Sequence, residues 1–248
     1  MLVRDPGPER QKTMGGRMAS NCTTRRRAGL PPGKEDLLKR ARDLQRRLER
    51  RVIEGDPARP LQWVAGIDVA YRGAWASAAV AVFGMPHLRE VASAVAVKHG
   101  VFDYVPGFFA LRELPLMTRA LRRLAQLPEV VLVDGHGRAH PRRFGTACHL
   151  GVMTGLATIG CAKTRLIGVY RDPGPEAGCS APLFDGIQQV GAVVRTRQGV
   201  RPVFVSVGHR ITLDTAVACV LACCRGCRLP EPLRRAHQLA RLALASAG

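Results

Sequence analysis

The feature that most constrains the fold is a set of three short runs, rich in valine and alanine, that follow one another closely. They are "WVAGIDVAY" (63–71), "SAAVAVFG" (77–84) and "EVASAVAVK" (90–98), and only "RGAW" and "GMPHL" separate them. Runs of this length and composition are typical of β-strands. Connections this short join antiparallel neighbours. The sequence therefore predicts an antiparallel three-stranded meander.

The rest of the chain predicts further strands alternating with helices. A continuous apolar run, "EVVLVDG" (129–135), indicates a fourth strand buried on both faces, and "TIGCAK" (158–163) indicates a fifth. Two more strand runs lie within 189–210, and the proline- and glycine-rich segment 170–189 is predicted to be a loop. Helical patterns occupy segments 34–52, 144–156, 212–224 and 231–245, and segment 105–127 is predicted to be a loop followed by a helix. This order predicts an α/β fold, a mixed sheet with helices on both faces.

The first 33 residues differ in character from the remainder. They have no hydrophobic periodicity, and residues 1–30 contain seven basic and two acidic side chains. Such a segment cannot bury enough apolar surface to order itself. We therefore expect a disordered basic leader over residues 1–33 and one folded domain over residues 34–248.

Positive charge dominates the whole chain. Thirty-eight Lys and Arg residues face 19 Asp and Glu, a formal net charge of +19 over 248 residues. That excess is typical of a nucleic-acid partner, although an arginine-rich genome would also produce part of it. The chain has neither an apolar run of membrane-spanning length nor the apolar region of a secretory signal. We expect a monomeric cytoplasmic protein without a membrane partner.

Four of the eight cysteines lie close together in "CVLACCRGC" (219–227). A structural zinc site needs two separated ligand pairs, whereas Cys219 and Cys223 are one turn apart in an apolar helix. Buried free thiols that pack as small hydrophobic groups are the preferred interpretation.

Three carboxylates lie where apolar neighbours leave them no local partner. Asp68 is inside the first strand, Glu113 follows apolar residues at the start of a helix, and Asp134 ends the fourth strand. Any one of them could be paired with an arginine, most easily Glu113 with Arg112. Together they suggest a hard-cation site, since Mg²⁺ takes oxygen ligands. A basic protein with such a site suggests phosphodiester hydrolysis.

Five segments, which follow one another in a fixed order along the chain, together resemble one known family. They are "VAGIDVAY", "YVPGFFALRELP", "VDGHGRAHPRRFGTACHLGV", "IGCAKTRL" and "SVGHRITLDTA". Over about residues 35–245 the chain resembles the endonuclease V family. The resemblance implies a ribonuclease H-like fold and cleavage of the second phosphodiester bond 3′ to inosine in deaminated DNA, with Mg²⁺ or Mn²⁺. RNA containing inosine is an alternative substrate.

The resemblance also implies roles for individual residues. The metal ligands fall on Asp68, Glu113 and Asp134, and the active-site lysine on Lys163. Either His209 or Asp214 completes the set. A loop, "DYVPGFF" (103–109), corresponds to the wedge that enters the base stack, and Gly135 and Gly137 are expected to let the nucleic-acid backbone approach. Base recognition and phosphate contact are implied for the following residues: Tyr104, Pro106, Gly107, Phe109, Gly135, His140, Gly145, Thr146 and Leu166.

Other interpretations remain open from the sequence. His140 is expected either to reach a phosphate or to cap the following helix. A ribonuclease H-like nuclease that acts on branched DNA is a second possible function. A third is a non-catalytic nucleic-acid-binding protein, which would be expected to lack at least one of the three acids.

Overall fold

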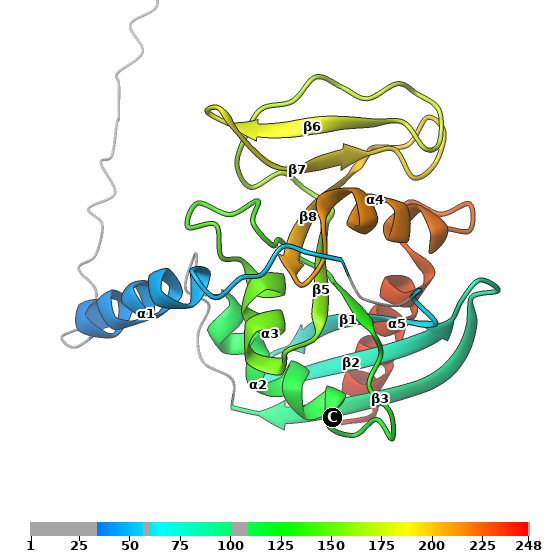
Figure 1. Cartoon of the computed structure of the whole chain (residues 1–248). Helices are drawn as coiled ribbons and strands as arrows, with labels where there is room; N and C mark the ends of the chain where they lie inside the picture. The colour runs from blue at the N-terminus through cyan, green and yellow to red at the C-terminus, as the bar shows by residue number, and fades with distance from the viewer. Residues whose placement is uncertain (1–33, 57–59, 101–108, 248) are drawn as a thin grey trace, which may run out of the picture.

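The computed structural model describes residues 34–56, 60–100 and 109–247 (Figure 1). A single eight-stranded sheet has the order β3-β2-β1-β4-β5-β8-β7-β6. The strands are β1 (Trp63–Arg72), β2 (Trp75–Gly84), β3 (Arg89–His99), β4 (Val130–Val133), β5 (Ala157–Ala162), β6 (Ser180–Asp185), β7 (Gln188–Val194) and β8 (Val203–His209). The predicted leader, residues 1–33, lies outside the described residues.

The first three strands form the predicted antiparallel meander. In β1 and β2, Asp68 pairs with Ala79 and Trp63 with Gly84. β2 and β3 are also antiparallel, and their register shifts once beside Val82. The small side chains of these runs are almost entirely buried on β2, which lies between the other two strands.

The centre of the sheet is parallel, and this arrangement positions the polar residues at the strand ends. β1 pairs in parallel with β4 and β4 with β5, so that Ile67 lies opposite Val133 and Val133 opposite Gly160. One position further along, Asp68 and Asp134 are therefore neighbours at the same edge, and Lys163 directly follows β5. β8 is antiparallel to β5, and its last residue, His209, pairs with Thr158 at the opposite edge.

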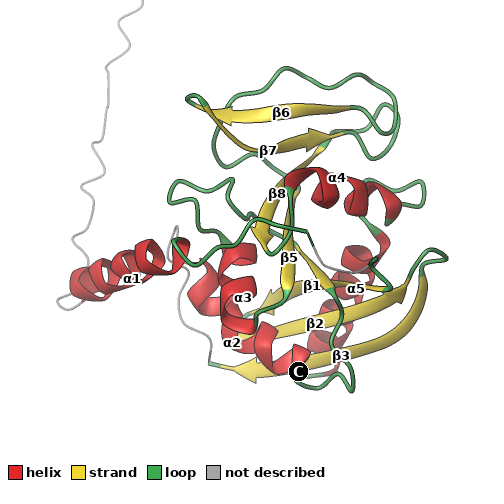
Figure 2. Ribbon diagram, in the orientation of Figure 1, coloured by secondary structure: helices red, strands yellow, loops and turns green. Residues whose placement is uncertain are grey.

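Helices cover both faces, as predicted (Figure 2). One face packs against α2 (Phe109–Leu121) and α3 (Thr146–Thr154), through buried residues that include Ile67 and Val131. The other face packs against α4 (Leu213–Ala222) and the start of α5 (Glu231–Ser246). Alternate residues of each central strand point to opposite faces, so both faces are apolar. The mixed α/β fold predicted from the sequence is confirmed.

The amphipathic helix at the start of the domain, α1 (Lys34–Glu49), packs on α3. Leu48 closes a small cluster with Phe144 and Cys148.

One sequence prediction about the sheet is wrong. Within the predicted loop 170–189, residues 180–185 form β6, which pairs antiparallel with β7. Pro182 lies in this strand, and proline is tolerated there because β6 is the outermost strand of the sheet.

All four clustered cysteines are free thiols, and two of them are buried as expected. Cys219 and Cys223 lie in the core between the sheet and α4, while Cys224 and Cys227 beyond the helix are partly exposed. Among the described residues, no helix combines the length and the apolar character needed to cross a membrane.

Candidate active site

Three carboxylates meet near one end of β1 and β4. Asp68 is 7% exposed and Glu113 on α2 only 2% exposed, whereas Asp134 is partly exposed. The phenol of Tyr71, on the same strand as Asp68, donates a hydrogen bond to Glu113 Oε1 at 3.1 Å. The Arg112 guanidinium stacks over the Tyr71 ring, 4.0 Å from its centre. Glu113 is therefore held by Tyr71 rather than by its sequence neighbour Arg112.

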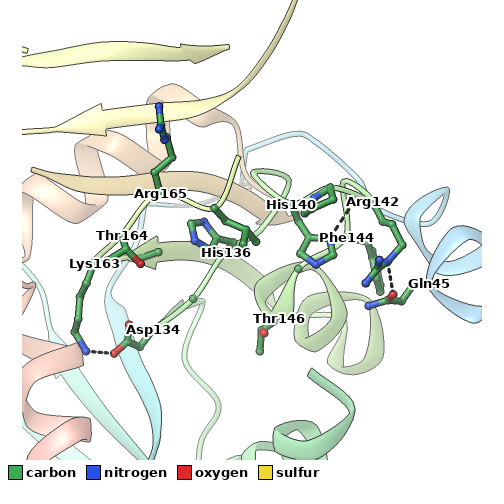
Figure 3. A pocket seen from close by; sticks show the side chains of 15 residues that line it. Gln45, Asp134, His136, His140, Arg142, Phe144, Thr146, Lys163, Thr164 and Arg165 are labelled. Carbon is green, nitrogen blue, oxygen red and sulfur yellow. Dashed lines mark hydrogen bonds and ion pairs between the residues drawn. The ribbon is translucent and has the colours of Figure 1, made fainter. Parts of the chain in front are cut away.

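Two nitrogen groups contact the acids from other elements. The Lys163 ammonium, just beyond β5, donates to Asp134 Oδ2 (Figure 3). His237 Nδ1, on α5, lies 2.6 Å from Asp68 Oδ2. Lys163 was predicted from the sequence, but His237 was not. It lies among charged and polar residues on α5, so the local sequence indicates only a solvated helix face. Only the packing of α5 on β1 shows that this histidine reaches an acid.

Without a bound cation, the ionised forms of the buried acids are electrostatically unfavourable. Burial, and then the charge of Asp134, raise the pKa of Asp68, against the opposing effects of His237 and Lys163. Burial also raises the pKa of Glu113 well above its ordinary value, and repulsion from Asp68 and Asp134 adds to this effect. Desolvation and a like charge both disfavour an ionised carboxylate. Such a cluster gains free energy from a cation.

The chemistry of the donor set fits a hard divalent cation. All three acids offer carboxylate oxygens, the ligands that Mg²⁺ and similar ions prefer. Among the described residues, no three His, Cys, Asp or Glu side chains lie in the arrangement of a preformed metal site. Asp134 is instead paired with Lys163, and Asp68 with His237.

A pocket of about 600 Å³ opens beside Asp134 and Lys163. In Figure 3 these two residues lie at one end of the pocket, and Gln45 and Arg142 lie at the other. Small and neutral groups form much of its wall, and its remaining lining residues are Gly135, His136, His140, Pro141, Phe144, Gly145, Thr146, Ala162, Thr164, Arg165 and Leu166. Five of the predicted recognition residues therefore share one pocket: Gly135, His140, Gly145, Thr146 and Leu166.

Two histidines in the pocket wall are neutral at physiological pH. Burial lowers the pKa of His136 to about 4 and that of His140 to about 4. His140 Nδ1 accepts a hydrogen bond from the Arg142 backbone N–H at 3.2 Å. This side chain therefore stabilises the turn before α3, and its position in the wall also lets it contact a ligand.

Neither residue expected to complete the set lies with the acids. His209 is 4% exposed, at the sheet edge opposite Lys163, and its Nδ1 accepts a hydrogen bond from the Ile53 backbone at 3.2 Å. Asp214, in the first turn of α4, lines a different hollow with residues of β6 and β7. The reason is the antiparallel direction of β8, which carries both residues to the wrong edge. His237, rather than either of these two residues, contacts one of the three acids.

Gly137 has a role within the fold itself. A Cβ atom at this residue would overlap the backbone of Val207 in β8. Glycine is needed there because two segments of the chain cross in contact. At Gly135 a Cβ atom would meet Thr146 at an ordinary 3.7 Å.

The remaining predicted residues cannot be placed. Tyr104, Pro106 and Gly107 lie outside the described residues, as does the side chain of Phe109, the first residue of α2.

Comparison with known proteins identifies the family of this chain. The family model described as endonuclease V matches residues 46–238. An endonuclease V from Roseiflexus sp. (strain RS-1) is 47% identical over 203 residues, 82% of this chain and 91% of the relative. This chain belongs to the endonuclease V family.

Solved structures of endonuclease V share the fold. The crystal structure of the Streptomyces avermitilis protein superposes with a TM-score of 0.80 at 47% identity, covering 84% of this chain and 93% of that one. The Ciona intestinalis endonuclease V, solved with a 24mer DNA containing an inosine followed by a ribo-adenosine, gives a TM-score of 0.76 at 26% identity, covering 86% and 100%. The matched range of the endonuclease V model includes every residue from Asp68 to His237.

Replacing Glu113 with glutamine is expected to stabilise the metal-free protein at neutral pH. The substitution removes a buried charge and keeps an oxygen that accepts from Tyr71. The pKa of Glu113 is raised in the folded protein, so ionising this side chain destabilises the fold. The wild-type protein therefore keeps its full stability below pH 4.5, the ordinary pKa of a glutamate, and loses stability as the pH rises above that value. The melting temperature in EDTA should therefore rise by several degrees at pH 7, with little change at pH 4.

The matched control is Glu176→Gln, at an exposed loop position, which should change neither melting temperature. A Glu113→Gln protein that melts below wild type at pH 7 would contradict the electrostatic explanation.

Proposed function

We propose that this chain is a metal-dependent repair endonuclease that cuts the second phosphodiester bond 3′ to inosine in DNA. The observation that carries this proposal is the position of the pocket: the 600 Å³ hollow shares Asp134 and Lys163 with the acid cluster. A base held in the pocket would place the phosphates that follow it next to the acids. The DNA in the Ciona intestinalis complex, which contains an inosine, supports this assignment.

Asp68, Glu113 and Asp134 would hold the metal ion of this metal-dependent family. We propose Mg²⁺, with Mn²⁺ as a substitute, because the donors are carboxylate oxygens. A divalent cation there supplies Lewis-acid stabilisation of negative charge on a phosphate.

Lys163 and His237 would act on the same phosphate. The Lys163 ammonium, beside Asp134, supplies a fixed positive charge for a phosphate oxygen. His237 orients the Asp68 carboxylate through Nδ1; as a water attacks phosphorus, Nε2 of the protonated ring would donate a proton to the oxygen that leaves.

The pocket would accept the deaminated base. Gly135 and Thr146 line the pocket where a base edge would lie, Gly145 beside them is held by backbone hydrogen bonds to Gly137 and His149, and buried Phe144 backs this wall. Flipping a base costs a few kcal/mol, and the wedge predicted around Tyr104 and Pro106 would offset part of this cost. We propose a monomeric, cytoplasmic enzyme, with inosine-containing RNA as an alternative substrate.

Cleavage of labelled oligonucleotides tests this function. Inosine-containing DNA and RNA, matched adenine controls and a branched DNA would be incubated with Mg²⁺, Mn²⁺ or EDTA, and the cut position mapped by size. Cutting at the second bond 3′ to inosine, only with metal, supports the proposal. Cutting of the branched substrate in preference to the inosine strands would refute it.

Replacing Tyr104 with alanine should reduce discrimination between inosine and adenine more than it reduces binding of undamaged DNA. Stacking of a base on an aromatic ring is worth about 1–3 kcal/mol, whereas phosphate contacts do not read the base. The ratio of kcat/KM on inosine and adenine oligonucleotides should fall by about tenfold. Tyr170, partly exposed and packed against Phe204, gives a control at Tyr170→Phe. An equal loss on both substrates would exclude the wedge.

A further inference from the structure

A second hollow adjoins the acid cluster on the side of α5. It has a volume of about 880 Å³ and runs along the exposed face of that helix. Lys163 lines both this groove and the base pocket, and His237, which contacts Asp68, lines the groove as well. The acid cluster therefore lies between two hollows that meet at Lys163.

One face of α5 supplies the positive charge of the groove. Arg234, His237 and Arg241 are spaced by three and four residues and so project from one side of the helix. The adjoining side, which includes Leu233 and Ala240, is buried. The groove face is thus fixed by the packing of α5 on the sheet.

The arginines of the groove differ in their pairing. Arg235 is paired with Glu90 at 2.7 Å, and Arg234 with Glu231 at 3.2 Å. Arg241 is exposed, and among the residues that the structure describes no carboxylate lies within 4.0 Å of its guanidinium. Arg241, one turn beyond His237, therefore has its charge available for a phosphate.

The position of the cut sets the polarity of a strand that crosses the site. If inosine occupies the pocket and the cut is made on its 3′ side, the strand runs 5′ to 3′ from the pocket across the acids. The next hollow on that path is the α5 groove. We propose that this groove binds the nucleotides 3′ of the cleaved bond, with Arg241 contacting a phosphate there. This inference rests on the proposed function.

Single-stranded oligonucleotides with arms of different length test the groove. One series keeps the 5′ arm constant and extends about two or about ten nucleotides beyond the cut; a second varies only the 5′ arm. Dissociation constants are measured in EDTA, so that no strand is cut, for wild type, Arg241→Ala and the control Arg197→Ala. Arg197 is exposed in the connection between β7 and β8.

Wild type and Arg197→Ala should gain affinity as the 3′ arm lengthens. Arg241→Ala should lose about fivefold to tenfold of that gain and keep the gain from the 5′ arm. On the long 3′ arm, its plot of log affinity against log salt should flatten by about 0.7 for a lost phosphate contact.

Equal weakening of Arg241→Ala on every oligonucleotide, or a loss confined to the 5′ series, would overturn the proposal. Separately, wild-type protein would be incubated with metal and the longest inosine strand. Absence of cleavage there would refute the proposed function, while the arm-length comparison would still decide whether the α5 groove binds the 3′ side.

Discussion

Asp134→Asn is expected to lower the rate of inosine-directed cleavage by about 10³-fold or more and to leave the fold intact. A bound metal supplies several kcal/mol of charge stabilisation, and each 1.36 kcal/mol corresponds to about tenfold in rate. Asparagine has nearly the same shape as aspartate but lacks the charge that the cation and Lys163 both require. Asp134 is partly exposed, so its replacement leaves no cavity.

Single-turnover cleavage with Mg²⁺ measures this effect, and circular dichroism checks the fold. Asp214→Asn is the matched control, because Asp214 is an exposed acid that lines a different hollow. It should cut at close to the wild-type rate. If Asp134→Asn retains near wild-type activity, or if Asp214→Asn loses as much, the assignment of the metal ligands is wrong.

His237→Ala should reduce cleavage by about 10²-fold or more, the lower range for loss of a positioned proton-transfer group. The substitution removes the ring that contacts Asp68 at 2.6 Å. Because the three acids remain, the rise in melting temperature that metal produces should persist. This readout separates His237 from the metal ligands.

His87→Ala, at an exposed position, is the control for the loss of a histidine. Wild-type activity in His87→Ala together with a large loss in His237→Ala is the expected pair of results. A His237→Ala enzyme as fast as wild type would show that the contact with Asp68 is incidental.

The sequence could predict that Asp68 and Asp134 have a function because both interrupt apolar strands, where a lone carboxylate is costly. Their adjacency also follows from a parallel pairing that the continuous apolar run before Asp134 suggests. Glu113 was recognisable for the same reason, as an acid on an otherwise apolar helix face.

The parts that could not be predicted depend on how elements pack or on the direction of a strand. His237 lies among Arg234, Arg235 and Gln238, so nothing in the local pattern distinguishes it from a solvated side chain. The position of His209 away from the acids could not be predicted, because the sequence does not reveal that β8 runs antiparallel to β5. β6 was missed because its proline is acceptable only on an outer strand.

The contact between Asp68 and His237 joins the first strand of the sheet to the last helix, across 169 residues of sequence. A ribosome adds about 5–20 residues per second, so Asp68 is synthesised several seconds before His237. A product released early, ending before α5, would retain most of its positive charge without the histidine. Such a product would also leave uncovered the apolar face of β1 and β2 on which α5 packs, so the helix that completes the core is the same one that brings the histidine to the acid.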